Sequence, residues 1–401
     1  MQSSVRLVYL LSLAGFTLCL LENNIEIEIN DGKILGSYKF TGNGRKFSAF
    51  KGIPYAKAPI NELRFLPPQP AEPWKDVKNT TQSGSSCPGL WTTGFIGNED
   101  CLYLNVHTPY LDNFPKQEPL PVLVFIHGGA YIFGSGAMAN GHFLLDQDVI
   151  LVAPNYRLNA FGFLSLNTSQ VSGNQGLMDQ QLALKWVQEN IFYFGGDPTK
   201  VTIIGQSAGS WSVLHQMLAP GSRGLFSGAI AQSGAFVGGK TLKPYTAEQD
   251  ASHGLGLAKI LGCSGDTVLE CMQSKTMNQI MSVPFLPRGS IDGVMLPGDP
   301  QELLENGQFN RVPLIIGNTD KEFILIADIL IGLLGVTPTM IQLGWPVIGP
   351  MLLTETYAQD VTLNDIAFAN EIKNFYIKPF GIFTHNNLEE LLDMATDALF
   401  Q

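Results

Sequence analysis

The sequence predicts an α/β protein: a mainly parallel central sheet with helices on both faces and an N-terminal β-hairpin. Two observations carry this prediction. From Leu102 onward, short apolar runs alternate with helical stretches. Continuous apolar runs suit strands covered on both faces, and their alternation with helices is typical of βαβ units. One such strand also runs directly into a Gly-rich turn and a helix, as the strands of α/β enzymes do.

The hairpin is predicted at the start of the chain. Residues Ile25–Ile29 alternate apolar and charged side chains, as a half-buried strand does. Asn30, Asp31 and Gly32 then form a turn, and Ile34–Phe40 forms the second strand. The segment Pro54–Pro73 contains six prolines and is predicted to be irregular surface chain.

The remaining elements follow the βαβ rhythm. The predicted strands are Val122–Ile126, Val149–Val152, Val201–Ile204, Gly228–Gln232 and a buried Pro313–Ile316, and the predicted helices are Gly176–Ile191 and Ser207–Leu218.

Composition argues against a disordered chain and against a nucleic-acid-binding protein. The chain has 401 residues, of which 45% are hydrophobic and 15% charged, so it can bury a large core and is not disordered. Its net charge of -11 repels nucleic acid, so no nucleic-acid partner is expected. No metal or other cofactor is expected.

The N-terminal sequence is typical of a secretory signal peptide. Arg6 precedes an apolar run, Leu7–Leu21, that is short for a membrane span. We expect a signal peptide over residues 1–19, a single domain over 20–401 and a secreted protein without stable membrane insertion. The alternative is an uncleaved anchor. A later apolar run, Phe323–Leu334, is interrupted by Asp328.

Cysteines and sequons agree with secretion. Removal of the signal peptide leaves Cys87, Cys101, Cys263 and Cys271. An even number in a secreted chain indicates disulfides, with three pairings possible, and two short loops are the most economical. Glycosylation sequons begin at Asn79 and Asn167.

The stretch Gly205-Gln206-Ser207-Ala208-Gly209 is the most informative in the chain. Between a strand and a helix, this G-x-S-x-G pattern predicts a nucleophile elbow that presents the Ser207 hydroxyl at the carboxyl end of a sheet. The glycines leave room for the sharp turn. The alternative is a chance match in a chain rich in Gly and Ser.

A nucleophilic serine also needs donors for the oxyanion that forms on its substrate. Gly128 and Gly129 follow the strand Val122–Ile126, and their N–H groups together with that of Ala208 suit this role. The alternative is a flexible turn. His127 precedes these donors, and we interpret it as structural.

The candidate acid is Glu322, which follows the last predicted strand by a few residues. A carboxylate on that loop can reach the carboxyl end of the sheet. Asp320 is the nearby rival, and a solvated surface loop is the alternative.

Two longer segments resemble a known family. Phe194-Gly195-Gly196-Asp197-Pro198, leading into the elbow, and Glu99-Asp100-Cys101-Leu102-Tyr103-Leu104-Asn105-Val106 are similar to the signatures of type B carboxylesterases and their cholinesterase relatives, which have the α/β-hydrolase fold. Arg64-Phe65, Asn155-Tyr156-Arg157, Asp179-Gln180 and Gln232-Ser233-Gly234 match further positions. The resemblance extends from residue 25 onward.

The resemblance assigns roles to individual residues. It implies Ser207 as nucleophile, Glu322 as acid, and Gly128, Gly129 and Ala208 as the oxyanion hole. It also implies disulfides Cys87–Cys101 and Cys263–Cys271.

The chain departs from the family pattern at two places. Gln206 stands where the family usually has Glu, a variant similar to insect juvenile hormone esterases and venom carboxylesterases. No Gly-x-x-His segment follows Glu322, although the triad histidine of the family comes there. His385 is the one histidine beyond Glu322, and its polar setting, Phe383–Asn387, does not suit a base. The stretch Leu388–Phe400 is similar to the family helix that precedes the missing strand, so we expect a C-terminally truncated form.

Two functions follow as expectations. The first is a secreted serine hydrolase of small apolar esters that acts through an acyl-enzyme on Ser207 and is impaired by the missing histidine. Tyr131 and Phe133 indicate an apolar site, and the short span Cys87–Cys101 disfavours cationic choline esters. The second is a non-catalytic, esterase-like binding or adhesion protein.

Overall fold

The computed structural model describes residues 24–91, 94–109, 111, 118–166, 168, 170–234, 243–320, 322, 337–353 and 363–377. Several predictions lie outside these residues: the signal peptide, the sequon at Asn167, the apolar run Phe323–Leu334, His385 and the helix Leu388–Phe400.

A large sheet forms the centre of the molecule, with strand order β1-β2-β3-β7-β9-β8-β10-β11-β12 and β4 paired to β2. Its strands are β1 (Asn24–Ile29), β2 (Gly32–Phe40), β3 (Lys46–Pro54), β4 (Lys78–Asn79), β7 (Tyr103–Thr108), β8 (Leu120–Ile126), β9 (Ile150–Pro154), β10 (Gly196–Gln206), β11 (Gly228–Gln232) and β12 (Leu314–Gly317). A separate hairpin joins β5 (Gly89–Trp91) to β6 (Gly94–Ile96).

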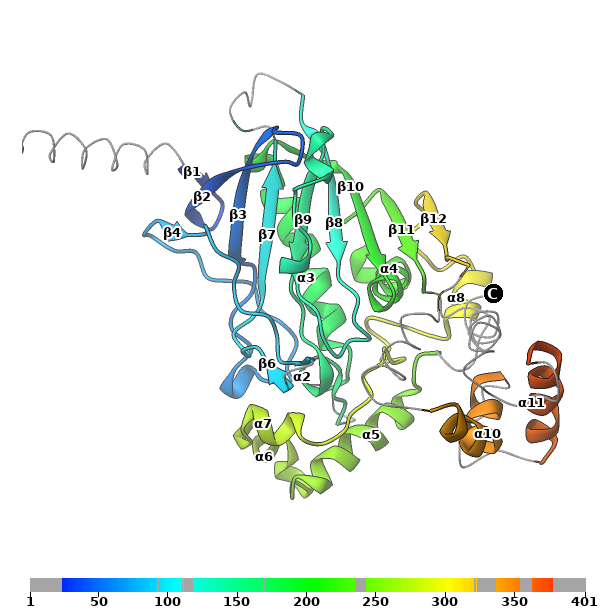
Figure 1. The fold of residues 1–401 in the computed structure, drawn as a ribbon. Helices are drawn as coiled ribbons and strands as arrows, with labels where there is room; N and C mark the ends of the chain where they lie inside the picture. Colours follow the sequence, from blue (N-terminus) through cyan, green and yellow to red (C-terminus); the bar gives the residue numbers. More distant parts are fainter. Residues whose placement is uncertain are drawn as a thin grey trace, which may run out of the picture.

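The two halves of the sheet differ in strand direction. From β9 through β8, β10 and β11 to β12 all pairs are parallel, whereas β1-β2, β2-β3, β3-β7 and β7-β9 are antiparallel. Figure 1 shows β8, β10, β11 and β12 pointing toward one edge and β7 pointing away from it. The predicted hairpin is confirmed, and the mainly parallel sheet is more accurately a mixed one.

Helices lie on both faces, as predicted. The first face packs on α3 (Gln175–Asn190) and α4 (Ala208–Leu218), with Val122, Val124 and Ile126 in the core. The second face carries the alternate side chains, including Leu151, which pack under the 3-10 helices η3 (Gly136–Met138) and η4 (Leu144–Asp146). Because successive side chains along a strand point to opposite faces, each face of the sheet has its own hydrophobic core.

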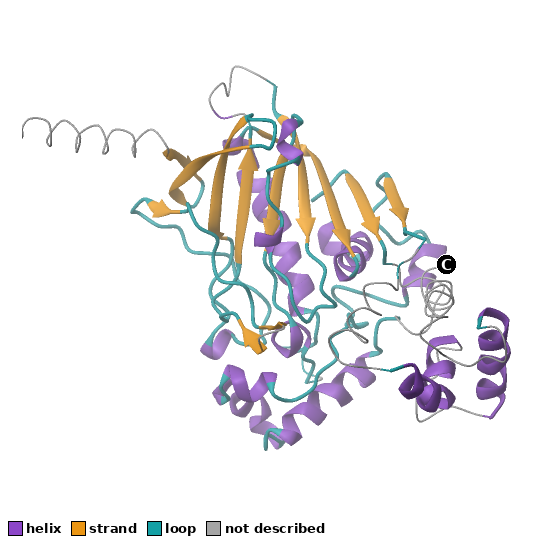
Figure 2. Ribbon diagram, viewed as in Figure 1, coloured by secondary structure: helices purple, strands orange, loops and turns teal. Residues whose placement is uncertain are grey.

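Further helices gather below the carboxyl edge of the parallel strands (Figure 2). They include α2 (Asn159–Phe163), α5 (Ala247–Ile260), α6 (Val268–Ser274) and α7 (Met277–Met281). The other helices are α8 (Pro300–Glu305), α10 (Pro338–Leu353), α11 (Leu363–Tyr376) and the 3-10 turns η1 (Asn61–Leu63), η5 (Ile191–Phe194), η6 (Pro220–Ser222) and η7 (Gly265–Thr267). Within the described ranges, none is long and apolar enough to cross a bilayer.

The prediction of a buried strand at Pro313–Ile316 was right about the strand and wrong about its burial. β12 is the last strand of the described sheet, and Ile315 is 67% exposed. An edge strand has a neighbour on one side only, so its apolar side chains lack cover on the other.

Two disulfides close the short loops, Cys87–Cys101 and Cys263–Cys271, which confirms the pairing that the resemblance implied.

Candidate active site

Ser207 lies at the turn between β10 and α4. Its backbone has φ 58° and ψ -125°, a conformation that residues with a side chain rarely adopt. The Ser207 N–H donates to the carbonyl of Gln232 at 2.9 Å, and the Trp211 N–H donates to the carbonyl of Ser207 at 3.1 Å. Strained backbone of this kind persists only where the surroundings hold it, and it is common at functional sites.

The two glycines of the turn allow β10, α4 and β8 to approach each other. A Cβ at Gly205 would lie 2.2 Å from the carbonyl oxygen of Gly209. A Cβ at Gly209 would lie 2.2 Å from the carbonyl oxygen of Ile126, the last residue of β8. The tight turn that the sequence predicted is therefore present.

The loop after β8 lies directly against Ser207. A Cβ at Gly128 would lie 3.4 Å from the Cβ of Ser207 and 2.5 Å from the carbonyl oxygen of Gln206. Positive φ values follow at Gly129 (113°), Ala130 (54°) and Tyr131 (59°), so the loop turns sharply around the serine.

Ala208 directly follows Ser207 in the chain. It is the first residue of α4, and its N–H belongs to the four at a helix start that have no acceptor within the helix. The turn thus brings a helix N-terminus and the backbone of Gly128 beside Ser207, an arrangement suited to anionic oxygen.

His127 supports this loop. Its ring stacks on Tyr156 with centroids 4.2 Å apart, its Nδ1 lies 2.9 Å from the carbonyl oxygen of Gly128, and the Tyr156 hydroxyl donates to the carbonyl of His127 at 2.6 Å. Burial lowers the pKa of His127 to about 4, so the ring is neutral at pH 7. These contacts favour the structural interpretation of His127.

The sequence placed Tyr131 at an apolar substrate site, but in the structure its side chain is buried. Its hydroxyl lies 3.1 Å from the Ser212 hydroxyl of α4, and its ring packs against Phe163 at 4.5 Å. The Ser212 hydroxyl also accepts from Gln180 of α3 at 2.9 Å. Tyr131 therefore ties the loop to the two helices beneath it.

An ion pair lies in the core beside the site. Arg157 is 2% exposed, and its Nε and Nη2 donate to the two carboxylate oxygens of Asp179 at 2.8 and 2.7 Å. The Arg157 N–H donates to the same carboxylate at 3.0 Å, and its Nη1 donates to the carbonyl of Leu66. The pair fixes the chain after β9 to α3. The sequence marked these residues by resemblance alone and did not show this role.

Glu322 lies at the expected edge of the sheet. Gly317, the last residue of β12, pairs with Gln232, which pairs with Gln206. The strand ends therefore bring the loop of Glu322 to the same edge as Ser207. Here the carboxylate accepts from the N–H of Thr319 at 2.5 Å, within its own loop.

Among the described residues, no histidine forms a hydrogen bond with Ser207. His215 lies on α4 with Nδ1 2.7 Å from the carbonyl oxygen of Trp211, His142 lies 3.2 Å from the carbonyl oxygen of Phe40, and His253 contacts Tyr245. The sixth histidine, His385, lies outside the described residues.

An apolar cavity of about 450 Å³ adjoins the loop at Ile132. It is lined by residues of the β5-β6 hairpin, α2, α7 and the chain after α7: Leu90, Phe95, Ile132, Asn159, Ala160, Ile280, Met281, Val283, Pro284, Phe285 and Leu286. Phe133, predicted near the site, packs against Trp91 at 6.0 Å. A cavity of this size and lining suits a small apolar group.

The chain is similar to known proteins along nearly its whole length. The family model described as "Carboxylesterase family" matches residues 23–401. Esterase E4 of Myzus persicae is 37% identical over 94% of this chain and 71% of its own length. Carboxylesterase 1E of Mus musculus is 34% identical (93% and 71%), and Venom carboxylesterase-6 of Apis mellifera is 34% identical (92% and 69%).

Proposed function

Because this chain belongs to the carboxylesterase family and is a carboxylic ester hydrolase by that membership, we propose that Ser207 is its nucleophile. The Ser207 hydroxyl oxygen attacks the ester carbonyl carbon, and the resulting oxyanion accepts hydrogen bonds from the N–H groups of Gly128, Gly129 and Ala208. The alcohol leaves with a proton, and water then releases the acid from the acyl-enzyme.

One observation carries the proposal: the strained turn at Ser207 lies against the loop of Gly128 and Gly129. A protein that only binds a ligand has no need of a strained backbone turn at this position. Removal of one oxyanion donor typically costs about 3 kcal/mol of transition-state stabilisation.

The substrate class in the proposal is a small, uncharged, apolar ester. The cavity beside Ile132 contains no charged residue in its described lining, so a cationic alcohol would lose its hydration there without a partner.

The proposed catalytic machinery has no base for Ser207 among the described residues. Glu322 is the proposed acid, but it binds its own loop, and no described histidine reaches Ser207. Without a base the serine keeps its proton, and the oxyanion hole and binding leave about 10³–10⁴-fold acceleration over water. We therefore expect slow turnover by this 401-residue chain.

Hydrolysis of 4-nitrophenyl butyrate tests these points. We expect slow hydrolysis that His385→Ala leaves unchanged and that added imidazole accelerates by supplying the base, and we expect Ser207→Ala to remove this acceleration. A large loss in His385→Ala would show that His385 completes the triad, and it would overturn the proposed impairment alone. An equal acceleration by imidazole in Ser207→Ala and in the wild type would overturn the nucleophile assignment.

The absence of a histidine beside Ser207 among the described residues favours a second candidate, a non-catalytic binding protein. That candidate predicts no hydrolysis dependent on Ser207, with or without imidazole.

We also propose a secreted, single-domain protein over residues 20–401, glycosylated at Asn79 and Asn167. The two disulfides, the exposed Asn79 and the similarity to a protein named as a venom carboxylesterase support this proposal. Loss of both sugars in Asn79→Gln and Asn167→Gln, read as a mass decrease of the secreted protein, tests it.

A further inference from the structure

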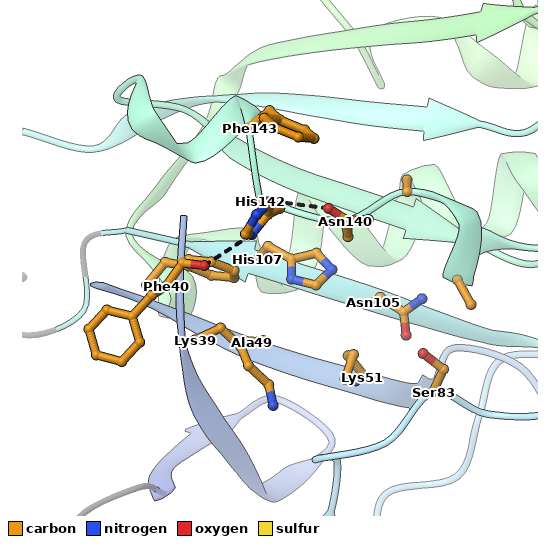
Figure 3. A pocket seen from close by; sticks show the side chains of 14 residues that line it. Lys39, Phe40, Ala49, Lys51, Ser83, Asn105, His107, Asn140, His142 and Phe143 are labelled. Carbon is orange, nitrogen blue, oxygen red and sulfur yellow. Dashed lines mark hydrogen bonds between the residues drawn. The ribbon is translucent and has the colours of Figure 1, made fainter. Parts of the chain in front are cut away.

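A second cavity, of about 410 Å³, is shown in Figure 3. It is bounded by β2, β3, β7 and the chain from Ala137 to Phe143. His107 at its centre pairs with Leu151 of β9, which pairs with Leu123, the middle residue of β8. Ser207 lies beyond the opposite end of these strands. His107 also contacts Phe47 on the second face of the sheet, opposite the face that α3 and α4 cover.

This cavity has positively charged lining residues and no acidic ones. Lys39 and Lys51 line it, and none of its fourteen lining residues is an Asp or Glu. Neither ammonium group forms a salt bridge with another described residue. Burial and the Lys39 charge lower the pKa of Lys51, and burial and the Lys51 charge lower the pKa of His107 to about 4. An anion between the lysines would relieve their repulsion.

Buried polar groups lie beside these charges. His107 is 4% exposed, and its Nδ1 has no hydrogen-bond partner in the described part of the chain. Asn105, also buried, accepts from the Gly52 N–H at 3.0 Å through its oxygen. A buried ring nitrogen without a partner is costly, and a ligand would supply one.

Aromatic side chains form the mouth of the cavity. Phe40 and Phe143 are 59% and 80% exposed, and both line it together with the more deeply placed Phe47. A purely inorganic anion would leave these rings in water, whereas an anion with an apolar body would cover them.

We propose that this cavity is a binding site for a small organic carboxylate, with its charged end at Lys39, Lys51 and His107 and its apolar body against Phe40 and Phe143. The site is separate from Ser207, and the proposal does not depend on the proposed hydrolysis.

Isothermal titration calorimetry of the full chain with 4-phenylbutyrate tests the site. We expect millimolar or tighter binding, and at least about tenfold weaker binding of the neutral 4-phenylbutyramide, because the amide lacks the charge that the lysines attract. The double variant Lys39→Met/Lys51→Met should bind the carboxylate at least about tenfold more weakly.

The double variant Lys75→Met/Lys185→Met is the matched control, because it removes the same two charges from exposed positions outside the cavity, and its affinity should equal that of the wild type. Thermal unfolding verifies that each variant is folded. Equal binding of acid and amide, unchanged binding by the folded double variant, or no binding by the wild type at millimolar concentration overturns the proposal.

Discussion

Replacement of Gly209 by alanine tests how tightly the chain is packed around Ser207. The new Cβ would lie 2.2 Å from the Ile126 carbonyl oxygen, whereas ordinary contact begins near 3.4 Å. α4 and β8 must therefore separate by roughly 1 Å in an interior that has no spare space. Overpacking of this kind costs about 1–3 kcal/mol of the free energy of unfolding. In a chain of 401 residues the expected fall in Tm is about 1–4 °C.

The position of the serine supplies a second readout. A shift of about 1 Å between the hydroxyl and its oxyanion donors typically costs about 100-fold in rate. We expect a loss of that order in the reaction of a fluorophosphonate with Ser207, followed by mass spectrometry.

Gly256→Ala is the matched control for this experiment. Gly256 lies within α5, and no atom lies within 4 Å of a Cβ placed there. Alanine favours a helix over glycine by about 0.5–1 kcal/mol, so the Tm should hold or rise. If Gly209→Ala matched Gly256→Ala in both Tm and labelling rate, the account of a closely packed turn would be refuted.

Three further predictions concern stability. Asp179→Asn should lower the free energy of unfolding in urea by about 3–5 kcal/mol, because Arg157 is then buried without its carboxylate; an unchanged midpoint would contradict this. The double variant Cys263→Ser/Cys271→Ser should lose about 2–4 kcal/mol in the same assay, and no loss would show that the loop is ordered without its cross-link. Burial raises the pKa of the Asp250 carboxyl from its ordinary value of 3.8 to about 7. The protonated carboxyl therefore contributes fully to the stability of the folded state below pH 3.8, and this contribution is lost as the pH rises through 7. Asp250→Asn should flatten the dependence of Tm on pH over that window, and parallel curves for wild type and variant would contradict the assignment.

The sequence predicted well those features that depend on neighbouring residues. The hairpin of β1 and β2, the strands β8 to β11 and the helices α3 and α4 all appear, with ends displaced by a few residues. The turn at Ser207 was predictable because its glycines, strand and helix are contiguous.

Several other features that join distant segments were not predictable. β3 was missed because Gly52 and Pro54 interrupt its pattern, so the antiparallel half of the sheet did not emerge. The sequence gives Tyr131 no sign of its partner Ser212, since the two are eighty-one residues apart. The exposure of β12 and the cavity at His107 likewise depend on which strands become neighbours.

The most direct test of the central claim is covalent labelling of the folded chain with a fluorophosphonate, with the modified peptide identified by mass spectrometry. We predict an adduct on Ser207 that forms faster than on the urea-unfolded chain, that free imidazole accelerates, and that Ser207→Ala abolishes. An adduct that forms at equal rates on the folded and unfolded chains, or on a different residue, would contradict it.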